Sequence, residues 1–478
     1  MNLLIQLKQT TSVFVVAFAL ACFGLSTAVQ AVSPAPDGGY PNFTTAEGDK
    51  ALFSLSTGAG NTAVGWRSLF LNTTGSLNTA VGAGTLALNT GDENTATGAG
   101  ALLSHMTGSA NTANGAFALL SDTGGQANTA IGDRSLFSNT TGNFNVANGF
   151  NALNNNTTGN DNTATGSAAL FANTTGHDNT ANGDVALFSN TDGFENTANG
   201  SFALSSNTSG NTNTAEGYQA LNSNTIGSVN TAIGDDALFS SMDASFNTAI
   251  GSAALMSLVT NDNNTAIGYL ALGNATGSNN TALGFKAGAN DTNGINNVYI
   301  GAGIMGVAGE SNNCYIASIF GSNTASGSPV FIDSTNKLGT IPSSRRFKES
   351  IKSMGTASES LFSLKPVSFR YKKEIDPTGT SQFGLVAEDV EKANPALVVR
   401  DKEGKPYSVR YDQVNAMLLN EFLKEHKAFV EEQGKVREQG ATIARLEQQV
   451  AALTAVVQKV SAQLELSKPA PQTALNNQ

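Results

Sequence analysis

The residues of this chain best suited to chemistry lie together at residues 342–348, where the sequence is Pro-Ser-Ser-Arg-Arg-Phe-Lys. A serine hydroxyl is a weak nucleophile that needs a base to remove its proton, and a neutral lysine amine can be that base. The stretch also marks a change of composition. A long array of short repeats rich in glycine and asparagine precedes it, and a segment of ordinary globular composition follows it.

Composition and charge exclude several classes of protein. Charged residues make up 13% of the chain, and the net charge is −11. Residues 44–325 carry 4 Lys and Arg against 18 Asp and Glu, whereas residues 343–478 carry 20 against 17. The acidic array repels phosphate backbones, so we expect no nucleic-acid partner. Low charge with regularly spaced apolar residues is not typical of a disordered chain.

The first 31 residues predict a secretory signal peptide, and residues 32–43 a linker. Lys8 precedes an apolar run at residues 12–25, and Ala31 ends a plausible cleavage sequence. The run is shorter than the roughly 20 residues of a membrane-spanning helix. We therefore expect no stable membrane span once the signal is removed.

Few residues suit metal or redox chemistry. Cys22 leaves with the signal unless it is lipidated, and Cys314 then has no intrachain disulfide partner. The repeat position of Cys314 predicts a small buried side chain. The histidines, His105, His177 and His426, are scattered along the sequence. We expect no metal site and no cofactor.

Internal repeats dominate the region before residue 326. The pentad Asn-Thr-Ala-x-Gly recurs with small variations at a step of 17 residues, shortened to 16 in places, and a degenerate copy begins at Thr44. The fuller unit is Asn-Thr-Ala-x-Gly-x-x-Ala-Leu-x-x-Asn-Thr-Thr-Gly-x-x. The pentads begin at Asn61, Asn78, Asn94, Asn111, Asn128, Asn145, Asn162, Asn179, Asn196, Asn213, Asn230, Asn247, Asn264, Asn280, Asn297 and Asn313.

This period predicts a mainly β fold. A coil of 17 residues is too short for a helical hairpin repeat, which needs about 34. It fits one coil of a parallel β-solenoid, with two short strands and two turns supplied by glycine and asparagine. We predict about 17 coils over residues 44–325, roughly 80 Å long at a strand spacing of about 4.8 Å.

The repeat also predicts which side chains face inward. Strand side chains alternate, so the Asn and Ala of the pentad share one face, and Thr and x share the other. The nearly constant Ala predicts a tight interior, and the leucines from Leu69 to Leu272 predict a buried ladder. The x residue is apolar in the first two full coils, mostly polar from Thr97 to Glu216 and apolar again from Ile233 to Ile316. This predicts a face buried at both ends of the array, with drift at an exposed position as the alternative.

A coil this small encloses little apolar volume, so association of several chains is expected. Over about residues 44–317, the pentads resemble the head repeats of YadA-like trimeric adhesins, in which similar repeats wind into a trimeric β-roll. The resemblance implies a homotrimer and an adhesive role. A threonine ladder that binds ice is the alternative for the array alone.

The C-terminal part predicts a different architecture. Residues 326–342 predict two short junction strands around a turn. Residues 343–435 predict a small α+β domain whose chain becomes helical from Tyr411. Residues 436–478 predict a coiled coil and a frayed tail, because apolar residues from Ile443 to Leu464 alternate steps of three and four.

Three segments, residues 343–348, 383–390 and 415–419, resemble the endosialidase-type intramolecular chaperone domain, with a resemblance that covers about residues 343–435. That family caps phage tailspikes and fibres and also occurs in bacterial surface proteins. It trimerises, assists folding of the preceding fibre and releases itself by autoproteolysis with a Ser-Lys dyad. The resemblance implies Ser343 as nucleophile, Lys348 as general base and cleavage between Pro342 and Ser343.

The residue types suit those roles. Packing of Lys348 against Phe347, with Arg345 and Arg346 nearby, would favour a neutral amine on Lys348 through desolvation and like-charge repulsion. Ser343 would attack the carbonyl of Pro342, and water would hydrolyse the resulting ester in a single turnover. Ser344 stands where the family often has Asp, so an uncut junction with a solvated basic cluster stays open.

These features predict a secreted or bacterial cell-surface homotrimeric fibre that adheres to a host-surface or extracellular ligand. Its C-terminal domain would act as a trimerisation chaperone and a self-cleaving serine peptidase. The alternatives are a phage-type tail fibre and an uncut surface protein that retains its chaperone domain.

Overall fold

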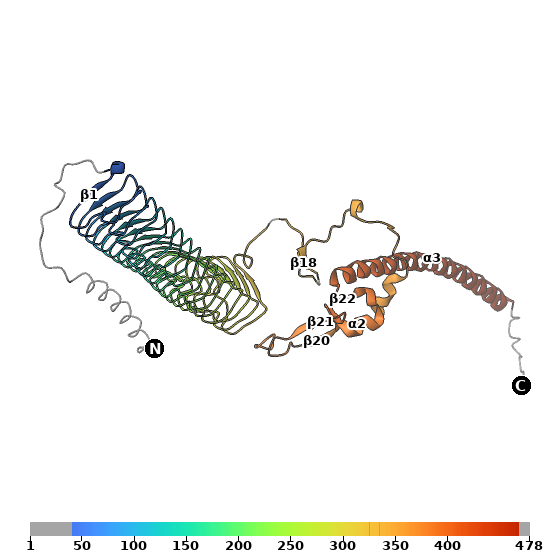
Figure 1. Ribbon diagram of the computed structural model, residues 1–478. Helices are drawn as coiled ribbons and strands as arrows, with labels where there is room; N and C mark the ends of the chain where they lie inside the picture. Colours follow the sequence, from blue (N-terminus) through green and yellow to red (C-terminus); the bar gives the residue numbers. More distant parts are fainter. Residues whose placement is uncertain (1–40, 325, 334, 468–478) are drawn as a thin grey trace, which may run out of the picture. The chain divides into compact units, whose positions relative to one another are not determined.

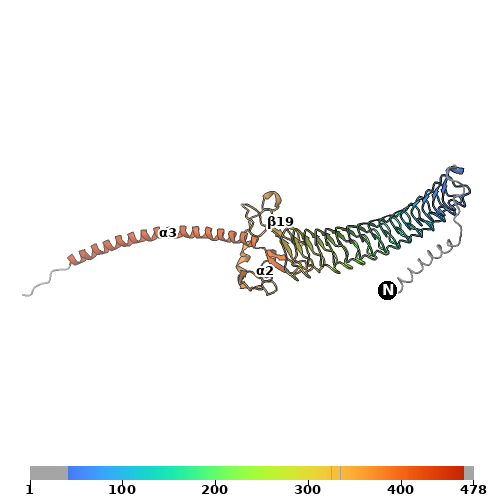
Figure 2. The ribbon, with the colours of Figure 1, turned by 90° about the vertical axis from the view of Figure 1, so that its left-hand side faces the viewer.

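The computed structural model describes residues 41–324, 326–333 and 335–467, so the predicted signal peptide and most of the linker lie outside the described residues. The described chain divides into two compact units, one up to Ser322 and one from Asn323. The first unit is the stack of coils coloured blue to yellow in Figure 1, and Figure 2 shows the same stack from a second side.

The first unit begins with the short 3-10 helix η1 (Pro41–Phe43), followed by a 17-stranded parallel sheet to which each coil contributes one three-residue strand. Equivalent residues of successive coils pair in register, so that Ala46 lies beside Ala63. This confirms the predicted parallel β-solenoid. The strands are β1 (Thr45–Glu47), β2 (Thr62–Val64), β3 (Thr79–Val81), β4 (Thr95–Thr97), β5 (Thr112–Asn114), β6 (Thr129–Ile131), β7 (Val146–Asn148), β8 (Thr163–Thr165), β9 (Thr180–Asn182), β10 (Thr197–Asn199), β11 (Thr214–Glu216), β12 (Thr231–Ile233), β13 (Thr248–Ile250), β14 (Thr265–Ile267), β15 (Thr281–Leu283), β16 (Val298–Ile300) and β17 (Cys314–Ile316).

The second strand predicted for each coil is absent from the described coils. Residues seven and nine of the coil take left-handed backbone conformations, as in Phe117 (φ 58°) and Leu119 (φ 51°), which an extended strand excludes. Hydrogen bonds between coils nevertheless continue there, because the Leu119 N–H donates to the carbonyl of Ser135 at 3.0 Å. The remainder of each coil is therefore a stack of turns.

The interior follows the predicted alternation. In most strands the middle residue is buried, while its neighbours are half-buried or exposed. The leucines from Leu69 to Leu272 are fully buried, as predicted. The ladder ends at Gly288, where the ring of Tyr299 fills the space: a Cβ on Gly288 would lie 2.7 Å from that ring. Tyr299 stacks on Tyr315 with ring centroids 5.4 Å apart, which closes the core.

Two ladders of buried asparagines line the rest of the interior. In the first, the pentad Asn162 donates its Nδ2 to Asn145 Oδ1 at 3.1 Å and to the carbonyl of Gly176 at 2.8 Å. In the second, formed by the twelfth residue of the middle coils from Asn139 to Asn224, Asn173 Nδ2 donates to Asn156 Oδ1 at 2.8 Å. Buried amides need partners, and each coil supplies those of the next. Hydrogen-bonded polar groups thus fill a coil too small for a large apolar core.

The glycine that follows the second ladder is required by close packing. A Cβ on Gly142 would lie 2.4 Å from the carbonyl oxygen of Gly159 in the next coil. Real Cβ atoms essentially never approach a backbone atom so closely, so a side chain at Gly142 requires the backbone to shift. Two later coils carry Ala244 and Asn261 at this place.

The second unit is small and contains three two-stranded antiparallel hairpins and one long helix. Its apolar core comprises six buried residues, Val390, Leu397, Val398, Val409, Val414 and Met417. Two-stranded hairpins are marginal alone, so a core of this size calls for further contacts. Its elements are β18 (Phe331–Ile332), β19 (Leu338–Gly339), η2 (Arg345–Phe347), η3 (Ala357–Ser363), β20 (Val367–Phe369), β21 (Gln382–Gly384), α2 (Ala387–Ala393), η4 (Pro395–Leu397), β22 (Val398–Arg400), β23 (Pro406–Val409) and α3 (Tyr411–Leu466).

Helix α3 is continuous over 56 residues, about 84 Å at 1.5 Å per residue. It runs through Gly434 and Gly440, although glycine is less favourable than other residues in a helix interior. The seam residues from Ile443 to Leu464 are all exposed in the single chain.

Candidate functional site

The residues of the predicted cleavage site lie on an exposed stretch of the second unit. Ser344 is extended (φ −64°, ψ 140°) and begins the single 3-10 turn η2, and Lys348 ends it. The Phe347 N–H donates to the Ser344 carbonyl at 3.0 Å, and the Lys348 N–H donates to the Arg345 carbonyl at 3.1 Å. This turn folds the chain between the two predicted catalytic residues, Ser343 and Lys348.

The single chain does not bring the predicted nucleophile and base together. Ser343 and Lys348 are both exposed, and no hydrogen bond joins them in the part of the chain that the structure describes. No described backbone N–H donates to the carbonyl of Pro342, the bond that would be attacked. The roles of these residues stay a prediction.

The ring of Phe347 contacts a different cation from the one predicted. The guanidinium of Arg346 lies 4.6 Å from the ring centroid, and the ring itself is 58% exposed. Stacking of a guanidinium on an aromatic face is attractive and holds that arginine beside the turn. Desolvation of Lys348 therefore requires groups from outside this turn.

A polar cluster around the buried Ser358, which the sequence did not indicate, joins η3 to the first turns of α3. The fully buried Ser358 donates its hydroxyl to Glu421 and accepts from Asn420 Nδ2 at 2.6 Å. Lys424 Nζ lies 2.7 Å from Glu421 Oε1 and 3.4 Å from Glu359 Oε1. Hydrogen bonds from Lys424 and then Ser358 lower the pKa of the Glu421 carboxyl. Because Ser358 is buried and fully engaged, this cluster is structural.

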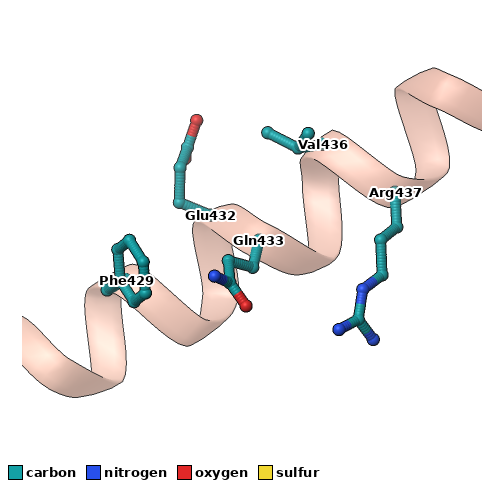
Figure 3. Close-up of a pocket in the computed structure, with 5 residues that line it drawn as sticks. All are labelled: Phe429, Glu432, Gln433, Val436 and Arg437. Atoms are coloured by element: carbon teal, nitrogen blue, oxygen red, sulfur yellow. The ribbon is translucent and has the colours of Figure 1, made fainter.

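Helix α3 presents an unpartnered surface for another helix. Figure 3 shows Phe429, Glu432, Gln433, Val436 and Arg437 around a shallow pocket formed by this helix alone. The first four follow the spacing i, i+3, i+4, i+7, the set that forms a hole for a knob of a facing helix in a coiled coil. The exposed seam continues this surface towards residue 464.

Other candidate residues carry no site in the described chain. His105 is buried and lies 2.6 Å from Asp122, and no group of three or more His, Cys, Asp or Glu residues that could hold a metal occurs among the described residues. Cys314 is exposed, so its predicted burial is wrong: it takes the threonine position of the pentad, which faces outward. No helix of the described residues is long and apolar enough to cross a membrane.

Part of the second unit matches the model of a known protein family. Residues 343–399 match the family model described as chaperone of endosialidase. No curated protein and no solved structure matches the chain. The match begins at Ser343, the residue that follows the predicted cleavage point, and it supports the predicted C-terminal chaperone domain. A β-solenoid followed by this domain fits a tail-fibre-like trimeric protein with an intramolecular chaperone.

Proposed function

We propose that the chain is a secreted or cell-surface homotrimeric fibre that adheres through its solenoid and is matured by its own C-terminal domain. In this proposal, the domain from Ser343 onward trimerises, assists folding of the solenoid and then releases itself. The observation that carries the proposal is the match to the chaperone of endosialidase over residues 343–399, directly after a long β-solenoid.

Three features of the second unit support association. Its core has only six buried apolar residues, although large apolar side chains such as Phe383 and Tyr407 are strongly exposed. The seam of α3 is exposed along its length. Apolar surface on this scale marks a protein contact in a soluble protein, and several copies of the chain would supply one to each other.

The proposed cleavage uses residues on both sides of η2. Lys348 Nζ accepts the proton of the Ser343 hydroxyl as its oxygen attacks the Pro342 carbonyl carbon. The bond from that carbon to the Ser343 nitrogen breaks, and the departing amine takes up the proton. Water then hydrolyses the ester, which leaves a carboxylate on Pro342 and a free amine and hydroxyl on Ser343. Exclusion of water from Lys348 would come from contacts between copies.

Denaturing electrophoresis of four chains that begin at residue 32 tests the cleavage. We expect the parent chain and the matched control Ser344→Ala to yield a fragment of residues 343–478, and Ser343→Ala to stay intact. Lys348→Met is expected to stay intact as well, because it removes the base and keeps a side chain of similar length. Intact parent chains would contradict self-cleavage and favour the uncut surface protein.

A further inference from the structure

The outward face of the solenoid carries an apolar row that the single chain leaves exposed. We call the side chains at the fourth residue of the pentad the outer row. From β12 to β17 this row is apolar in every coil and pairs in register, as in Ile267 beside Leu283. Its members over these six strands are Ile233, Ile250, Ile267, Leu283, Ile300 and Ile316.

The predicted burial of this face is not found in the single chain. Ile233 and Ile250 are half-buried, while Ile267 is 37% and Leu283 48% exposed. The coil itself does not require apolar residues here, because Asn182 and Glu216 occupy the same position in β9 and β11 with the same backbone. Contacts inside the chain therefore do not explain the apolar end of the row.

A second copy of the chain is the occupant that fits this row. The row ends at β17, and the association domain of the proposed function begins 26 residues later, after residues 317–342. Copies held together from residue 343 onward would keep their β12–β17 coils at an effective concentration in about the millimolar range. Around a symmetry axis, each residue meets its own equivalents, so a single file of isoleucines and leucines is complementary to itself.

The middle of the row has the opposite character. From β4 to β11 it is polar in every coil except that of Ile131, and it ends in Glu216. Equivalent carboxylates that meet at an axis repel each other, and unpaired amides are costly to bury. These coils gain nothing from close contact and stay hydrated.

We propose, on the basis of the proposed homotrimer, that copies of the chain meet along the outer row of β12–β17 and not along that of β4–β11. The solenoids are then held together next to the chaperone domain and separated along their middle. The fibre presents its polar middle coils to solvent on all sides.

Cysteine cross-linking tests this contact. Two variants of the chain from residue 32, Ile267→Cys and the matched control Asn182→Cys, are made with Cys314→Ser and Ser343→Ala, so that the domains stay joined. Mild oxidation is expected to give interchain disulfides in the Ile267→Cys variant and none in the Asn182→Cys variant. Maleimide should label residue 267 several-fold more slowly than residue 182 in the native protein and equally fast in urea.

The native mass, measured together with the cross-linking, distinguishes failure of this contact from failure of the proposed homotrimer. A native mass of three chains with equal cross-linking at residues 182 and 267 would overturn the contact and leave the trimer intact. A native mass of one chain would overturn both. Protection of residue 267 without interchain cross-links would show that the chain covers its own row, which also overturns the contact. The Ile267→Asn variant should fold, because β9 carries asparagine at the same position. By weakening the contact, it should speed maleimide labelling of Cys314, which lies on the same face.

Discussion

A buried histidine–aspartate pair, His105 and Asp122, interrupts the second asparagine ladder and allows a quantitative prediction. Both side chains are fully buried in adjacent coils. His105 Nε2 lies 2.7 Å from the carbonyl oxygen of Gly108, which can only accept, so this nitrogen carries a proton. His105 Nδ1 lies 2.6 Å from Asp122 Oδ2, a hydrogen-bond distance that requires a second proton between these two atoms. Asp122 Oδ1 takes the ladder position and accepts from Asn139 Nδ2 at 2.8 Å.

The two single substitutions by asparagine should differ in cost. In His105→Asn, the new amide can take the ladder position of its own coil, but the buried carboxylate of Asp122 loses its histidine partner. This loss should lower the free energy of unfolding by about 3–5 kcal/mol. In Asp122→Asn, a neutral imidazole still donates to Gly108 and accepts from the new amide, so the cost is about 0–1 kcal/mol. The double variant restores the ladder found in neighbouring coils and should be within about 1 kcal/mol of the parent.

Urea unfolding of the parent, the two single variants and the double variant, followed by circular dichroism, measures these free energies. Hydrogen exchange of residues 100–125 shows whether the losses are local. A double-mutant cycle then gives a favourable coupling of about 2–6 kcal/mol between the two positions, from the summed costs of the single variants minus the cost of the double variant. Equal costs for the two single variants, or a double variant as unstable as their sum, would refute the assignment of protons and donors.

Four further substitutions test other parts of the structure. Ser241→Ala should raise the free energy of unfolding by about 1 kcal/mol, because the buried Ser241 hydroxyl has no hydrogen-bond partner among the described residues; a loss in urea unfolding would contradict this. The hydrogen bond to Glu310, together with burial, raises the pKa of Tyr315 to about 12, so the folded state holds this proton more tightly than the unfolded state. The stability that this proton contributes is complete below pH 10 and is lost as the pH rises from 10 to 12. The melting temperature of Tyr315→Phe should therefore fall less steeply over this pH range than that of the parent. An equal fall in both proteins would contradict this prediction. Gly142→Ala should cost several kcal/mol through its backbone clash, whereas Gly440→Ala, in open space on α3, should stabilise the helix by about 1 kcal/mol, both measured by thermal unfolding.

The solenoid could be predicted from the sequence because its period and alternation follow directly from burial. The constant alanine and the leucine of each coil occupy positions where the neighbouring coils leave no other space, as the fully buried Ala164 and Leu170 show. The second asparagine ladder was missed because asparagine also favours turns, and both uses give the same residue at the same position. The prediction of a second strand was wrong because the residue type leucine gives no sign of the left-handed backbone that Leu170 adopts (φ 53°).

The cleavage site could be predicted only as a set of residue types. The spacing of Ser343 and Lys348 indicates that a short turn can lie between them, and η2 is such a turn. Whether the hydroxyl meets the amine depends on side-chain rotamers and on the groups that exclude water. In the part of the chain that the structure describes, no such groups cover Ser343 and Lys348, which are both exposed. Cys314 was misplaced for a similar reason, because a small residue suits either face of a strand.

The native mass of the chain from residue 32 tests the central claim, a homotrimeric fibre, most directly. Light scattering after size-exclusion chromatography measures this mass without assumptions about shape. The account predicts the mass of three chains for Ser343→Ala and of three residue 32–342 fragments for the parent after cleavage. The mass of a single chain or a single fragment would contradict it.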